Sequence, residues 1–325
     1  EDRLLQRAVA RILETIYEQD FLPCSYGFRP GRSAHDALRQ IRNQCMAGRV
    51  STVFETDIRG FFDHLDHQWL MKMLRVRVAD PVILRLIGRW LKAGAMVDGV
   101  LQKAEQGSPQ GGPISPLLAN IYLHYALDLW FQKRFSKTIR GRAYLTRYAD
   151  DFVVCFEFKT EATIFEGQVK ERLSQFHLEL AENKTKLVRF GRIPSLKGKE
   201  TGTFTFLGFQ HVAGRDRQGR FAVLRLPAQK SCSRLLETVK SELRRNCHAR
   251  GPQQQMILLR KLRGFYQYFG LHGAQKRLMR VRNHVLYAWR QAIRNQGQRS
   301  KAAWYQLKRR SWFDLPYPEV LHPTV

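Results

Sequence analysis

Residues 144–156 decide the fold, and they read Tyr144-Leu145-Thr146-Arg147-Tyr148-Ala149-Asp150-Asp151-Phe152-Val153-Val154-Cys155-Phe156. Two short runs of β-branched, aromatic and aliphatic residues lie on either side of Ala149-Asp150-Asp151, and this pattern predicts a β-hairpin. The hairpin places two adjacent acids at its turn. Asp tolerates turn geometry, so such a pair is by itself most often a solvated turn. Two adjacent carboxylates also repel each other, and a bound cation would neutralise them.

A second acidic position, Asp57, ends a strand expected over 51–57 and precedes Ile58-Arg59-Gly60-Phe61-Phe62. Alone, Asp57 could simply terminate that strand. Taken with Asp150 and Asp151 it favours a metal site, because hard carboxylate oxygens suit Mg²⁺. Two such ions about 4 Å apart can activate an attacking hydroxyl and stabilise a leaving oxygen in phosphoryl transfer.

Length and composition bound the class of protein. The chain has 325 residues, of which 44% are hydrophobic, which suits about two globular domains. We find no run of about 18 apolar residues, so we expect no transmembrane helix. The start, Glu1-Asp2-Arg3-Leu4, is not a signal peptide and lacks Met, so we expect a fragment. Five widely spaced cysteines without a CxxC pair predict reduced thiols in a cytoplasm, not a disulfide framework or zinc site.

The charge is high and uneven. The formal net charge is +27, and a protein this basic usually meets a polyanion such as nucleic acid. Residues 211–325 hold 24 Lys and Arg against 5 Asp and Glu, which gives +19 for that region alone. Aromatic side chains alternate with these cations in the same region. A basic surface with interleaved aromatics favours nucleic-acid binding, although a solvated helical bundle with an aromatic core reads the same way.

Several blocks of the sequence resemble one enzyme family. Tyr148-Ala149-Asp150-Asp151 resembles the YxDD signature of reverse transcriptases, and residues 57–62 are similar to their first palm block. Further blocks, in the order of the family, resemble those of group II intron-encoded enzymes at 25–33, 106–120, 182–186, 206–209 and 262–270. The chain is identified as a member of the bacterial group II intron-encoded reverse transcriptase/maturase family. We expect the type without an endonuclease domain, because little sequence follows Trp312.

The resemblance implies an α+β, right-hand polymerase fold. It has partial fingers, an α/β palm with an antiparallel sheet, and an α-helical thumb. The expected domains are a fingers remnant over 1–50, the palm over 51–210, a linker over 211–227, the thumb or maturase (X) domain over 228–311, and a tail over 312–325. The family's basic segment upstream of the first helix is missing, so we expect reduced fingers or a truncated chain.

The resemblance also implies an activity and its residues. The activity is RNA-directed DNA polymerisation, in which a primer 3′-OH attacks the α-phosphate of a dNTP with the aid of two Mg²⁺ ions, or Mn²⁺. By resemblance, the catalytic and metal-binding residues are Asp57, Asp150 and Asp151, with the Ile58 carbonyl as a further metal ligand and Lys184 as proton donor to pyrophosphate. By resemblance, the nucleotide-binding residues are Phe62, a steric gate against ribonucleotides, together with Gln110, Gly111 and Arg29.

The expected partners are an RNA template (the protein's own intron RNA), a DNA or RNA primer and dNTPs, with no membrane, in the bacterial cytoplasm. The expected nucleic-acid contacts in the thumb are Arg263, Tyr266, Lys276, Arg277 and Arg280. The resemblance also implies help in intron splicing and mobility. Two alternatives stay open: an RNA-binding splicing maturase with an idle polymerase site, and a domesticated reverse transcriptase of antiviral or CRISPR-linked type.

Overall fold

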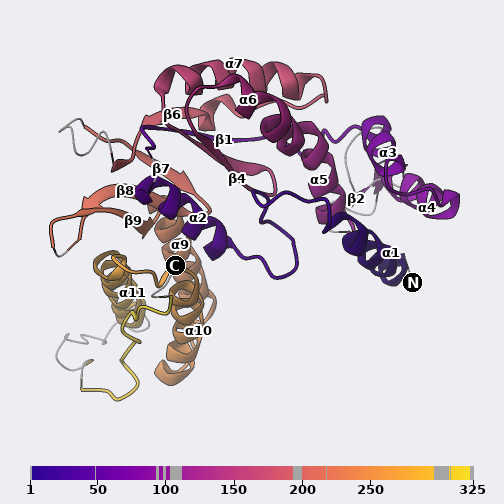
Figure 1. Cartoon of the computed structure of the whole chain (residues 1–325). Helices are drawn as coiled ribbons and strands as arrows, with labels where there is room; N and C mark the ends of the chain where they lie inside the picture. Colours follow the sequence, from indigo (N-terminus) through magenta and orange to yellow (C-terminus); the bar gives the residue numbers. More distant parts are fainter. Residues whose placement is uncertain are drawn as a thin grey trace. The chain divides into compact units, whose positions relative to one another are not determined.

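The computed structural model describes residues 2–47, 49–92, 95–97, 100–102, 112–192, 200–216, 218–295, 307 and 309–322 (Figure 1). The chain divides into two compact units, Glu1–Gly202 and Thr203–Val325. Within the described ranges, every helix is too short or too polar to cross a lipid bilayer. Each unit has its own sheet and its own helices, and each is described separately below.

A four-stranded antiparallel sheet forms the centre of the first unit. Its strand order is β4-β5-β1-β6, with bounds β1 (Thr52–Asp57), β4 (Ala143–Tyr148), β5 (Asp151–Phe156) and β6 (Lys186–Arg189). The expected hairpin is confirmed: β4 and β5 pair from Ala143↔Phe156 to Tyr148↔Asp151. The strand expected to end at Asp57 is confirmed as well.

Helices cover both faces of this sheet, and the middle of each central strand contributes apolar side chains to the core. On one face lies α7 (Lys159–Ser174), whose Phe165 ring packs on Phe54 of β1 at 5.3 Å and on Phe156 of β5 at 5.4 Å. On the other lies α2 (Ala34–Ala47), where the Cys45 sulfur is 4.0 Å from that of Cys155 (Figure 1). Alternate residues of β5 therefore enter different layers of the core, as the two-residue repeat of a strand requires.

The helix starts follow local capping. Ser33 and Asp36 exchange hydrogen bonds at the start of α2, and Asp66 accepts from the amide of Trp69 at 2.7 Å at the start of α3. Ser and Asp are among the residues that favour such helix starts. The remaining elements of the unit are α1 (Asp2–Tyr17), α3 (His67–Arg75), α4 (Pro81–Lys92), β2 (Ala95–Val97), β3 (Val100–Gln102), α5 (Ser115–Leu123), η1 (His124–Asp128), η2 (Phe131–Phe135), α6 (Ser136–Thr138) and η3 (Glu182–Lys184).

The long helical segment that begins at Ser115 contains two π-helical turns. The α-helix α5 passes into η1 and then η2 before a last turn, α6. A π turn inserts an extra residue and rotates the side chains that follow it, and such turns often mark functional positions. Here η1 ends at Asp128, whose carboxylate is completely buried in the unit.

The described residues of the second unit include a three-stranded antiparallel sheet and three long helices. Their bounds are β7 (Thr203–Phe206), β8 (Phe209–Arg215), β9 (Phe221–Pro227), α9 (Gln229–Arg245), α10 (Gly251–Phe269) and α11 (Gln275–Arg294). The aromatic run at 204–209 resembles one short strand in sequence, but it forms a tight hairpin, because Leu207 and Gly208 take positive φ values of 51° and 75°. Residues 211–227, expected as a linker, lie mostly in β8 and β9, which pair with each other.

Candidate active site

The central sheet brings three carboxylates together at one end. Asp57 is the last residue of β1 and Asp151 is the first of β5, and the two are direct partners in the antiparallel register. Asp150 precedes Asp151 in the turn that joins β4 to β5. The turn closes through Ala149, whose φ of 55° is unusual for a residue with a side chain. Residues almost a hundred positions apart in sequence thus meet because two strands pair.

The carboxylates of this group act on each other. Burial raises the pKa of Asp150 above its ordinary value, and the nearby charge and hydrogen bond of Asp57 raise it further. Asp150 therefore holds a proton more readily than an isolated carboxylate does. Like-charge crowding of this kind is relieved when a cation binds between the groups.

Lys184 supplies one cation to the group. It ends the short 3₁₀ helix η3, and its ammonium donates to Oδ2 of Asp57. That hydrogen bond raises the pKa of Lys184, and the charges of Asp57, Asp151 and Asp150 add to the effect. The amine is therefore protonated, and the charges of all three acids act on it.

The backbone around Asp57 is fixed by two hydrogen bonds. The amide of Ala181 donates to the Asp57 carbonyl at 2.8 Å, and the amide of Arg59 donates to Glu179 at 2.9 Å. Neither bond uses the carbonyl of Ile58, which lies between them. An open cleft of about 780 Å³ runs along this segment and is lined in part by Asp57, Ile58 and Lys184.

The donor set suits a divalent metal ion. Asp57, Asp150 and Asp151 offer only carboxylate oxygens, the ligands that Mg²⁺ and Mn²⁺ prefer. In the described part of the chain, no three His, Cys, Asp or Glu side chains are grouped as a finished metal site. The Lys184 ammonium instead neutralises Asp57. A metal ion would therefore have to compete with Lys184 for Asp57. Its positive charge would also lower the pKa of Asp150.

The expected nucleotide-binding residues fall into different places. Phe62 is half-buried against the core and packs on Phe61 at 5.5 Å between ring centroids. It follows Asp57 by one tight turn, since Asp63 and His64 both bond back to the Gly60 carbonyl. Gln110 and Gly111 lie outside the described residues.

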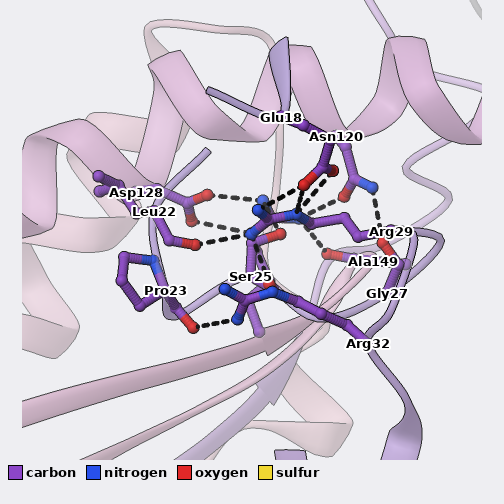
Figure 2. Close-up of polar contacts among 11 residues, drawn as sticks. Glu18, Leu22, Pro23, Ser25, Gly27, Arg29, Arg32, Asn120, Asp128 and Ala149 are labelled. Carbon is purple, nitrogen blue, oxygen red and sulfur yellow. Dashed lines mark hydrogen bonds and ion pairs between the residues drawn. The ribbon is translucent and has the colours of Figure 1, made fainter. Parts of the chain in front are cut away.

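Arg29 is not at the carboxylates. Its side chain is 3% exposed and forms an ion pair with Glu18 at 2.8 Å, while its guanidinium also donates to the carbonyls of Leu22 and Ser25 (Figure 2). Arg29 also lies over the Phe21 ring. The expectation of a nucleotide contact is therefore not supported, because the guanidinium N–H groups that would bind a phosphate already donate to acceptors inside the protein. A basic loop residue looks the same in sequence whether it faces inward or outward.

The sequence reasoning missed a buried polar network directly behind the acidic turn. Its centre is Arg147, which is fully buried, as is its ion-pair partner Asp128. Asn120, Ser25 and the carbonyl of Ala149 complete the network (Figure 2). One signal was available: an arginine interrupts the otherwise apolar run of β4 two residues before the acidic turn, and a charge there needs a partner.

In the second unit, the expected nucleic-acid contacts divide into exposed and internal residues. Arg263, Lys276 and Arg280 are exposed. Tyr266 is buried, and burial raises its pKa to about 12 while its hydroxyl donates to the Pro316 carbonyl. Arg277 donates to Gln210 at 2.8 Å and to the Pro227 carbonyl at 2.9 Å. Tyr266 therefore serves the core of its unit, and the aromatic pattern that predicted stacking on a base was a packing pattern.

An antiparallel sheet with three carboxylates at one end, held by the first strand and a tight hairpin, defines the palm of a nucleic-acid polymerase. The family described as "Reverse transcriptase (RNA-dependent DNA polymerase)" matches residues 1–211, so the chain belongs to the reverse transcriptase family. The α+β polymerase fold expected from the sequence is thereby confirmed. The structure of apo telomerase from Candida Tropicalis shares this fold, with a TM-score of 0.52 at 14% identity over 94% of this chain and 57% of that one.

The curated relatives include intron proteins. Protein YkfC of Escherichia coli K12 is 35% identical over 269 residues, which are 71% of this chain and 66% of that protein. The group II intron-encoded protein LtrA of Lactococcus lactis is 46% identical over 123 residues, or 38% of this chain and 20% of that protein. This chain thus spans less than two thirds of these relatives. The expected resemblance to group II intron reverse transcriptases is confirmed.

Proposed function

We propose that this protein is an RNA-directed DNA polymerase that extends a primer 3′-OH with dNTPs on an RNA template. The observation that carries the proposal is the pairing of Asp57 with Asp151 beside the Asp150 turn, inside a unit that the reverse transcriptase family matches. Pairing on the sheet makes the acidic site a rigid feature, and catalysis of phosphoryl transfer depends mainly on positioning and on charge neutralisation.

In this mechanism Asp57, Asp150 and Asp151 would hold two divalent metal ions, Mg²⁺ or Mn²⁺, with the Ile58 carbonyl as a further ligand. Such ions lower the pKa of an attacking hydroxyl and offset the charge that develops on the phosphate. In this proposal the protonated amine of Lys184 would give a proton to the pyrophosphate leaving group. Its ion pair with Asp57 supports this role, because the pair keeps the amine protonated and next to the acids.

Nucleotide selection rests on Phe62, with Gln110 and Gly111 as further parts of the pocket. Phe62 is held against the core and is half-buried, so its ring cannot swing away freely from an incoming sugar. A fixed ring at that place would clash with a ribose 2′-OH. Discrimination by a clash rejects the wrong nucleotide without any added attraction for the correct one.

The proposed partners are an RNA template, a DNA or RNA primer and dNTPs. The exposed side chains of Arg263, Lys276 and Arg280 support contacts with phosphates. The similarity to LtrA supports an intron RNA as the template and a role in splicing and mobility. The free cysteines support a reducing compartment, the bacterial cytoplasm.

The test is primer extension on an RNA template with Mg²⁺, comparing wild type with Asp150→Asn. We use Glu171→Gln as the matched control, because Glu171 is an exposed carboxylate of α7. The proposal predicts DNA synthesis that is lost in Asp150→Asn and kept in Glu171→Gln. Tight RNA binding and splicing support without synthesis would favour the alternative of a maturase with an idle polymerase site.

A further inference from the structure

All five N–H groups of the Arg147 guanidinium are used inside the first unit. Nε donates to Oδ1 of Asp128 at 2.8 Å, and Nη2 donates to Oδ2 of Asp128 at 2.6 Å and to Oγ of Ser25 at 2.9 Å. Nη1 donates to Asn120 at 2.9 Å and to the carbonyl of Ala149 at 3.0 Å (Figure 2). A rigid planar fork with five fixed acceptors has one orientation.

The bond to Ala149 reaches the acidic turn itself. The peptide group is planar, so the direction of the Ala149 carbonyl also sets the direction of the Asp150 amide. Ala149 has a φ of 55°, a conformation that a residue with a side chain keeps only when its surroundings hold it there. The fixed charge of Arg147 supplies such a constraint one peptide group away from the first turn carboxylate.

The finger segment 24–27 is bound to the same turn. The amide of Arg147 donates to the Cys24 carbonyl at 2.8 Å, and the amide of Tyr26 donates to the Arg147 carbonyl at 2.9 Å. Asn120 donates to the Gly27 carbonyl at 2.7 Å. A Cβ on Gly27 would lie 2.5 Å from the amide nitrogen of Ala149. Gly27 is thus needed for close approach to the turn.

We propose that Arg147 is a positioning residue for the carboxylates of the turn, and that segment 24–27 completes the support. This inference rests on the proposed function of Asp150 and Asp151. Stability alone is a poor reason for the arrangement, because a buried ion pair is often no more stabilising than apolar residues of the same size. The planar guanidinium of Arg147 instead fixes the direction of the Ala149 carbonyl, and a metal site depends on residues that orient its ligands.

The first test is Arg147→Lys, which keeps the charge and loses the fork. A single ammonium cannot hold Asp128 and the Ala149 carbonyl in their present directions. We expect the Mg²⁺ concentration for half-maximal synthesis to rise about 10- to 100-fold, the usual effect of losing a group that orients metal ligands. Mn²⁺ affinity, measured by calorimetry without nucleotides, should weaken by the same factor, while primer–template affinity stays within about twofold.

The second test is Gly27→Ala, which keeps Arg147 and the side chains that it contacts and pushes on the backbone before the acidic turn, where the added Cβ would lie 2.5 Å from Ala149 N and 3.1 Å from the Tyr148 carbonyl carbon. It should shift the metal dependence in the same direction. The matched control is Gly167→Ala, because a Cβ at Gly167 meets nothing within 4 Å. A second control is Thr146→Val in β4, the strand that carries Arg147. The buried hydroxyl of Thr146 has no hydrogen-bond partner among the described residues, so its loss should not disturb the network.

The outcomes separate this inference from the proposed function. If wild type makes no DNA, or if Asp150→Asn makes as much as wild type, the proposed function fails. If Asp150→Asn is inactive while folded Arg147→Lys and Gly27→Ala keep the wild-type Mn²⁺ affinity and Mg²⁺ midpoint, only the positioning role is overturned. If Arg147→Lys does not fold, Gly27→Ala decides between the two results.

Discussion

Asp57 and Asp151 are direct partners on the antiparallel strands β1 and β5. This pairing is the reason why two acids so far apart in sequence share a site. The register is protected by the core, because Phe54 and Phe152 of the same strands are fully buried. A slip of one residue would move each of these side chains to the opposite face of the sheet. The packing that stabilises the sheet therefore also places the carboxylates.

Asp128→Ala is expected to lower the free energy of unfolding by about 3–5 kcal/mol, because it leaves the buried charge of Arg147 without its partner. Urea denaturation followed by tryptophan fluorescence measures this. Glu166→Ala is the control, since the pair of Glu166 with Lys170 is a partly exposed i,i+4 pair on α7 and should contribute at most about 0.5 kcal/mol. Equal, small losses in both variants would contradict the account of a buried network.

Phe165→Ala is expected to cost about 3–5 kcal/mol of stability, the usual range for removing a buried aromatic ring. Phe165 contacts aromatic rings from β1, β5 and the segment after α5, so its loss opens a cavity that no single neighbour can fill. The adjacent Ile164 is 52% exposed. Ile164→Ala should lower stability by less than about 1 kcal/mol in the same denaturation experiment, and a loss as large as that of Phe165→Ala would argue against this core.

Phe62→Val is expected to relax the choice of sugar. Removing most of the ring removes the clash with a 2′-OH, so the ratio of kcat/KM for dNTP to that for rNTP should fall by about 10- to 100-fold, chiefly because rNTP use improves. Single-nucleotide incorporation on an RNA template measures both values. If rNTP use stays at the wild-type level while dNTP use falls, Phe62 supports the core and does not select the sugar.

His211→Phe is expected to change how stability depends on pH. Burial, together with the smaller effect of the Arg225 charge, lowers the pKa of His211 from 6.5 to about 3. Between these values the unfolded chain binds a proton that the folded chain does not, so wild type should lose up to about 1.4 kcal/mol per pH unit as pH falls below 6.5.

A phenylalanine keeps the stack on Phe204, where the rings lie 4.4 Å apart, and removes this titration. The variant should therefore show a flatter profile of unfolding free energy between pH 4 and 6.5, values taken inside the window set by the two pKa values of His211. Denaturation curves at several pH values measure the slope. Identical slopes for wild type and variant would mean that His211 does not titrate as described.

The sequence predicted the acidic strand ends, because short apolar runs bounded by turn residues identify strands locally. Asp57 and Asp151 could be placed in the right elements in this way. The sequence did not reveal Arg147 and Asp128 as a pair, because they lie on different elements and Asp128 ends a π-helical turn that the sequence pattern does not predict. Tyr266 was expected to contact nucleic acid, but it is buried. The spacing of aromatic residues along a helix does not show which face of the helix packs against the core.

The hairpin at residues 203–215 could also not be predicted from the sequence. Leu207 has a positive φ of 51°, which side chains seldom adopt, so the apolar run Phe204–Phe209 read as one strand. Tertiary packing decides such a turn: the Gly208 carbonyl accepts hydrogen bonds from the Ala228 amide and the Ser231 hydroxyl. Signals of this kind come from distant residues and cannot be read from a local pattern.

The central claim is that the paired acids of β1 and β5 form the catalytic centre. Its most direct test is the single-turnover rate of dNTP addition on an RNA template by Asp57→Asn and Asp151→Asn, each beside Glu171→Gln. We predict that both Asp variants lose on the order of 10³-fold in rate, or about 4 kcal/mol of transition-state stabilisation, while Glu171→Gln matches wild type. Folded Asp57→Asn and Asp151→Asn proteins that add dNTPs at the wild-type rate would contradict the claim.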